Sequence, residues 1–159
     1  MMDIKTERGQ QTLLDEYQAA HIFEHWFPTH RYIVTPKDLP AKVDAVIVKD
    51  GEVVGVVETK CRYDMTLEQF HNQRNSDWMI SASKVFWGQQ CAEILAVKFV
   101  GFLYLVKDKV LLFKPIADHK GRLIGDISFE ERVTQSTVNG GQKFDRVALI
   151  NMKDAQELR

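Results

Sequence analysis

The stretch Val43–Lys60, V-D-A-V-I-V-K-D-G-E-V-V-G-V-V-E-T-K, carries the strongest structural signal in this 159-residue chain. Two runs rich in Val and Ile, Val43–Val48 and Val53–Val57, lie on either side of Asp50-Gly51. β-Branched residues favour strands, and Asp-Gly favours the tight turn of a hairpin. The pattern therefore predicts two antiparallel strands, apolar enough to lie in the interior of a sheet.

The length of the turn determines which side chains share a face of this hairpin. A two-residue turn at Asp50-Gly51 places Asp44 opposite Val57, so that Asp44 and Glu58 point to opposite faces. A three-residue turn that includes Glu52 places Asp44 directly across from Glu58. We expect the second arrangement, or an equivalent bulge, because only carboxylates on one face could share a metal ion.

The second strand ends in Glu58-Thr59-Lys60, an acid-x-Lys pattern. The same pattern occurs at Asp3 and Asp118, but only here does it end an apolar strand. Side chains alternate along a strand, so Glu58 and Lys60 point to the same face. Burying both charges is unfavourable without partners. With Asp44 on the neighbouring strand they could hold a hard cation and orient a water, although a plain salt bridge at a strand end remains the alternative.

The rest of the chain predicts an α/β fold with a mixed central β-sheet flanked by helices. We expect one domain, because 159 residues suit a single core and no linker interrupts the sequence. The expected helices are 11–27, a short piece after Thr66, and a longer one capped by Ser76 or Asp77 and running to Ala96. The expected strands besides the hairpin are 32–35, 99–106, 110–113, 127–138 and 146–150, with a turn at Asn139-Gly140-Gly141.

With Asp44 and Glu58-Thr59-Lys60, this element order resembles the PD-(D/E)XK, or restriction-endonuclease-like, nuclease superfamily. The resemblance covers an αβββαβ core of about residues 11–115, and extra C-terminal β-strands fill about 116–159. It implies that Asp44, Glu58 and the Thr59 carbonyl bind Mg²⁺, with Mn²⁺ able to substitute, and that Lys60 positions or activates the attacking water. Val43 stands where the family usually has proline.

Two helical faces add candidate residues. Glu16 lies on the mostly apolar face of the first helix, where the superfamily often has an additional acid, and the resemblance implies that it helps to bind the metal. The alternative is an edge residue that reaches solvent. Lys84 is the one charge in an apolar stripe of the later helix, where the superfamily often has a polar or basic active-site residue. The alternative for Lys84 is a lysine that extends from the margin of the core to solvent.

Charge is nearly balanced, with 21 Lys plus Arg against 22 Asp plus Glu and a net charge of −1. This excludes a globally basic nucleic-acid coat, so phosphate binding needs charge sorted by region. The net charge is −3 over residues 1–60 and +3 over 98–159. An acidic metal site beside a basic surface fits a phosphodiesterase that acts on DNA with weak sequence specificity or by structure. We further expect a homodimer, which suits the cutting of two strands.

The cysteines and the N-terminus predict where the protein works. Cys61 and Cys91 have no metal-ligand spacing, and the polar start of the chain lacks the apolar core of a signal peptide. The longest apolar run, Ile94–Val106, is too short to span a bilayer. We therefore expect a cytoplasmic protein without membrane association.

Two other functions compete with the nuclease. One is a catalytically silent nuclease-fold module that binds nucleic acid or a protein. The other is a zinc hydrolase, since His21, Glu24 and His25 form an H-x-x-E-H pattern. Both histidines lie opposite the apolar helix face, however, and zinc catalysis needs a third protein ligand.

Overall fold

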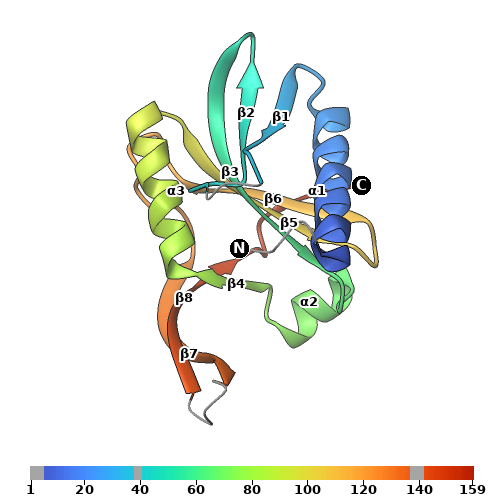
Figure 1. The fold of residues 1–159 in the computed structure, drawn as a ribbon, viewed down its shortest axis with the longest axis vertical. Coiled ribbons are helices and arrows are strands. Elements are labelled where there is room, and N and C mark those ends of the chain that lie inside the picture. The colour runs from blue at the N-terminus through green and yellow to red at the C-terminus, as the bar shows by residue number, and fades with distance from the viewer. Residues whose placement is uncertain (1–5, 38–40, 137–141) are drawn as a thin grey trace.

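The computed structural model describes residues 6–37, 41–136 and 142–159 (Figure 1). Helix α1 (Glu7–Trp26) is followed by strands β1 (His30–Val34), β2 (Ala45–Lys49) and β3 (Glu52–Arg62). Next come α2 (Leu67–Gln73), β4 (Asp77–Ser81), α3 (Ala82–Leu95) and β5 (Lys98–Leu105). The chain ends in β6 (Val110–Ala117), β7 (Ile127–Ser136), β8 (Gln142–Asn151) and β9 (Gln156–Leu158).

The central sheet has the order β1-β2-β3-β5-β6-β9. Strands β3 and β5 are parallel and the other neighbours are antiparallel. The parallel pair requires a crossover, which is made by the segment that contains α3. The predicted α/β class with a mixed central sheet is therefore confirmed. Within the described residues, no helix is both long and apolar enough to cross a membrane.

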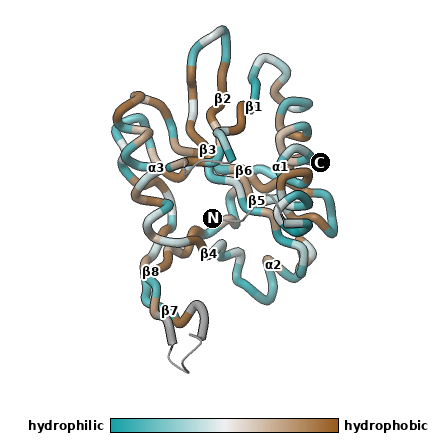
Figure 2. The backbone as a smooth tube through the Cα atoms, in the orientation of Figure 1, coloured by the Kyte–Doolittle hydropathy of each residue, from teal (hydrophilic) through white to brown (hydrophobic). Residues whose placement is uncertain are grey.

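Helices α1 and α3 cover opposite faces of this sheet (Figure 1). On the α1 face, Phe23 packs with Val57 and Phe102. On the α3 face, Val85 packs with Val56 and Phe99. Successive residues of β3 thus enter different cores, as the alternation of side chains along a strand requires. Figure 2 shows the hydrophobic segments concentrated along the strands between the two helices.

One predicted helix is wrong in its first part. Residues 77–81, which the sequence assigned to a helix running to Ala96, form strand β4; the helix begins at Ala82. Asn75 and Ser76 adopt positive φ, so the chain reverses there instead of entering a helix. Strand β4 pairs with β8, about 70 residues further along the chain. This distant partner overrides the local helical pattern.

The C-terminal part of the chain serves two sheets. Strands β4, β8 and β7 form a second, three-stranded sheet, and its far end projects away from the central sheet (Figure 1). Strand β9 instead joins the edge of the central sheet beside β6. The expected C-terminal β-strands are present, but they do not form one separate extension. The turn expected at Asn139-Gly140-Gly141 lies outside the described residues.

Candidate active site

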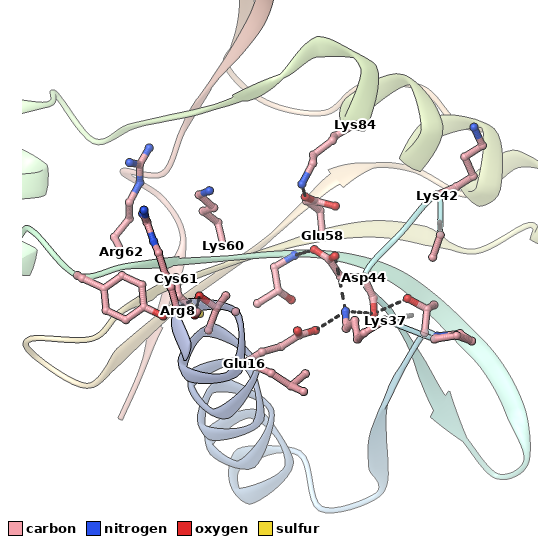
Figure 3. Close-up of a pocket in the computed structure, with 18 of the residues that line it drawn as sticks. Arg8, Glu16, Lys37, Lys42, Asp44, Glu58, Lys60, Cys61, Arg62 and Lys84 are labelled. Atoms are coloured by element: carbon pink, nitrogen blue, oxygen red, sulfur yellow. Dashed lines mark hydrogen bonds and ion pairs between the residues drawn. The ribbon is translucent and has the colours of Figure 1, made fainter. Parts of the chain in front are cut away.

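A cleft of about 1010 Å³ lies where β2 begins beside β3, between α1 and α3. All six residues singled out from the sequence line this cleft: Glu16, Asp44, Glu58, Thr59, Lys60 and Lys84. Glu16 comes from α1, Asp44 immediately precedes β2, and Lys84 comes from α3 (Figure 3). The structure thus brings together side chains from elements on both faces of the sheet.

A bulge sets the register of the hairpin that carries Asp44 and Glu58. The turn has two residues, Asp50 and Gly51, both with positive φ, and Lys49 pairs with Glu52. The register then shifts, because Ile47 pairs with Gly55 while Val48 pairs with Val53. Val54 is the extra residue. The three-residue turn is therefore not formed, and the equivalent bulge takes its place.

As a result Ala45 lies opposite Val57, which leaves Asp44 beside Glu58. Oδ2 of Asp44 accepts a hydrogen bond of 2.8 Å from the backbone N–H of Thr59. Burial raises the pKa of Glu58 from 4.5 to about 7, and the negative charge of Asp44 adds to the rise. The two carboxylates therefore share one site, as the metal hypothesis requires.

Glu58 is only 3% exposed and its main partner is Lys84. Nζ of Lys84 donates to Oε1 of Glu58 over 2.7 Å. Burial lowers the pKa of Lys84, but the contact with Glu58 outweighs it, so the pKa is raised and the ammonium stays charged. Lys84 thus reaches the site from α3, with 42% of its side chain exposed.

Glu16 is buried, contrary to the alternative in which it reaches solvent. Its Oε1 accepts a hydrogen bond of 2.7 Å from the hydroxyl of Tyr32 and lies 3.3 Å from Nζ of Lys37. Burial raises the pKa of Glu16, while Lys37 and Tyr32 oppose the rise. The hydroxyl of Tyr32 also lies 2.7 Å from Oγ1 of Thr59, which connects α1 to β3 through two hydroxyl groups.

Lys60 lies on the Glu58 side of β3 and is exposed to solvent within the cleft (Figure 3). Desolvation lowers its pKa, as do the positive charges of Arg62 and Lys84. A lysine with a lowered pKa is a better proton acceptor at neutral pH, and while charged it can stabilise an anion. This position suits either role predicted for Lys60.

Sequence reasoning missed Lys37 and Tyr32. Nζ of Lys37 lies between Glu16 and Asp44, 3.7 Å from Oδ1 of Asp44 and 3.1 Å from its carbonyl oxygen. Lys37 lies outside the strands, so no periodicity could have placed it there. Tyr32 lies in a strand that the sequence predicted, and a polar tip on an inward-facing aromatic residue was the available signal.

The donor set fits a hard divalent cation. Asp44 and Glu58 present adjacent carboxylates whose mutual repulsion a dication would relieve, and Mg²⁺ in proteins is held by one or two carboxylates plus waters. Ammonium groups neutralise these acids in the structure: Lys84 contacts Glu58, and Lys37 contacts Asp44. Across the described residues, no group of three or more His, Cys, Asp or Glu side chains is arranged to hold a metal ion.

The H-x-x-E-H residues of α1 lie away from the cleft lining. His21 and His25 are exposed. Glu24 accepts a hydrogen bond from the backbone N–H of Tyr32 and forms an ion pair with Arg31. Its carboxylate thus connects α1 to β1.

No protein-family model matches this chain, and no curated protein matches it.

Proposed function

We propose that this protein is a Mg²⁺-dependent nuclease of the PD-(D/E)XK type that hydrolyses phosphodiester bonds in DNA. The observation that carries the proposal is the pairing of Asp44 with Glu58 at the end of a buried hairpin, with Lys60 two residues further on the same face. The order of α1, β1–β3, α3 and β5, with β5 parallel to β3, supports a restriction-endonuclease-like core.

Each residue has a distinct role in this proposal. Asp44 and Glu58 hold Mg²⁺ or Mn²⁺, with the Thr59 carbonyl and, from the α1 wall, the Glu16 carboxylate as further ligands. The bound cation supplies Lewis-acid activation of the scissile phosphate. Lys60 orients the attacking water or stabilises the charge that develops on the phosphate. Lys84 keeps the Glu58 carboxylate oriented through its 2.7 Å contact.

DNA is the proposed substrate because basic side chains surround the acidic centre. Arg8, Lys60 and Arg62 line one end of the cleft and point into it (Figure 3). These groups suit the phosphates that flank a scissile bond. Because the chain carries a net charge of −1, we propose salt-sensitive cutting that is structure-selective or weakly sequence-specific. We also propose that the protein acts in the cytoplasm as a homodimer, which suits the cutting of two strands.

A second candidate is a catalytically silent module of the same fold that binds nucleic acid or a protein. The internal neutralisation of the acids favours it: Lys37 contacts Glu16 and Asp44, and Lys84 contacts Glu58. Such pairing can hold the fold together without a metal.

Cleavage assays separate these candidates. Purified protein is incubated with supercoiled, linear and branched DNA in Mg²⁺, in Mn²⁺ or in chelator, beside the variant Asp44→Asn. The nuclease proposal expects metal-dependent cleavage that Asp44→Asn abolishes. DNA binding without cleavage on every substrate would instead favour the silent module. Cleavage that survives in Asp44→Asn would point to a contaminating nuclease and contradict the proposal.

A further inference from the structure

Lys37 occupies the space between two carboxylates that come from different elements. Its Nζ lies 3.3 Å from Oε1 of Glu16 and 3.7 Å from Oδ1 of Asp44 (Figure 3). The ammonium also donates to the carbonyl oxygen of Asp44 over 3.1 Å. One positive charge thus bridges the α1 wall of the cleft and the start of β2.

This bridge neutralises acids that otherwise repel each other. Glu16 is buried, and the charge of Asp44 disfavours its ionised form. Lys37 opposes that effect. An ammonium in this position does electrostatically what a divalent cation would do, with one charge instead of two.

The position of Lys37 also allows its ammonium to be replaced by a metal ion. Lys37 retains 19% exposure of its side chain and sits at a cleft open to water, so its ammonium can leave for solvent without breaking a packed core. Lys84 differs because it contacts Glu58 and neither Glu16 nor Asp44. The group placed to compete for Glu16 and Asp44 is therefore Lys37.

We infer that Lys37 is a built-in counter-ion that competes with the divalent cation for Glu16 and Asp44, so that the ammonium must leave these carboxylates when the metal binds. The inference rests on the proposed function, because it concerns the same metal site. Lys37 stabilises the metal-free protein and weakens its affinity for metal. By linkage, the part of this stabilisation that is lost when the metal binds equals the loss in the free energy of metal binding.

Isothermal titration calorimetry with Mn²⁺ alone tests this competition in the wild type and in Lys37→Met. We expect Lys37→Met to bind Mn²⁺ about tenfold more tightly. Its metal-free melting temperature should be lower than that of the wild type, and saturating Mn²⁺ should raise it by more. Both readouts are independent of DNA cleavage.

Lys42→Met is the matched control. Lys42 lines the same cleft, but its Nζ lies 4.3 Å from the centroid of the Trp87 ring. Its removal changes the net charge of the cleft equally without vacating the space between Glu16 and Asp44. We therefore expect a much smaller gain in Mn²⁺ affinity from Lys42→Met than from Lys37→Met.

The outcomes are distinguishable. Unchanged or weaker Mn²⁺ binding in Lys37→Met, with binding intact in the wild type, overturns this inference and leaves the proposed function standing. Equal gains in Lys37→Met and Lys42→Met overturn it as well, since they reveal only general electrostatics. Absence of Mn²⁺ binding to the wild type and both variants overturns the proposed function and the inference together. Should Lys37→Met not fold, Lys37→Gln keeps a polar side chain there and is expected to change affinity in the same direction.

Discussion

Nζ of Lys84 lies 2.7 Å from Oε1 of Glu58, so an ammonium from α3 contacts a buried carboxylate on β3. Even with this partner, burial and the charge of Asp44 hold the pKa of Glu58 at about 7. Lys84 therefore offsets only part of the effect of burial and of Asp44 on the ionisation of Glu58. A group of this kind is common at functional sites.

The raised pKa of Glu58 predicts a pH-dependent folding stability. Because the pKa of Glu58 in the folded protein, about 7, exceeds its ordinary value of 4.5, the neutral form of the carboxyl favours folding. That contribution is complete below pH 4.5 and is lost as the pH rises through about 7. The full loss is on the order of 3 kcal/mol. Glu58→Gln should remove this pH dependence. The free energy of unfolding of the variant, relative to that of the wild type, should therefore increase as the pH rises from 5 to 8.

Urea unfolding of both proteins in chelator at pH 5 and pH 8 checks this prediction. Lys84 loses its partner in Glu58→Gln, but its side chain is 42% exposed and can be hydrated. A difference between the two proteins that is the same at both pH values would contradict the prediction.

Lys60→Ala tests the chemical centre of the proposed nuclease. Lys60 is exposed, so its removal should change the free energy of unfolding by less than about 0.5 kcal/mol. Loss of a group that stabilises developing charge should reduce the rate of DNA cleavage by about 100-fold or more. Single-turnover cleavage in Mn²⁺ measures the effect.

Lys49→Ala is the control for that experiment, because Lys49 is an exposed lysine of the same hairpin at the end away from the cleft. It should cleave at nearly the wild-type rate. Equal losses in the two variants would show that Lys60 acts only through general attraction of DNA.

Deletion of Val54 tests the role of the bulge. The deletion removes the extra residue while Ile47 remains opposite Gly55 and Val48 opposite Val53. Asp44 should therefore stay beside Glu58, and Mn²⁺ affinity measured by calorimetry should remain close to that of the wild type. Loss of Mn²⁺ binding in a variant with an unchanged circular dichroism spectrum would show that the bulge itself, and not only the register, shapes the site.

Gly88→Ala tests the packing of α3 on the sheet. A Cβ at Gly88 would lie 2.2 Å from Cε2 of Phe99, whose side chain is fully buried. Because the ring cannot move without disturbing the core, we expect a loss of about 2 kcal/mol or more in the free energy of unfolding. Gln90→Ala, at an exposed position of the same helix, should leave stability nearly unchanged. Equal denaturation midpoints for the two variants would contradict the prediction.

The sequence by itself determined the elements whose signals are local. The Val-rich runs and Asp50-Gly51 predicted the hairpin, and the capping box at Thr66 and Gln69 fits the predicted start of α2. Alternation along one strand was enough to place Glu58 and Lys60 on one face. These features depend on neighbours within a few residues, which is the range over which propensity and periodicity act.

Only the tertiary structure decided what depends on distant partners. Strand β4 became a strand because β8 pairs with it, although its own sequence suggested a helix. The hairpin has a bulge and not a longer turn, which is seen only from the pairing of β2 with β3 along the whole length of β2. Lys37 reaches Glu16 and Asp44 because the fold brings the residues that follow β1 close to α1. Long-range packing and charge pairing select among local options of similar energy, and a single sequence pattern does not encode that selection.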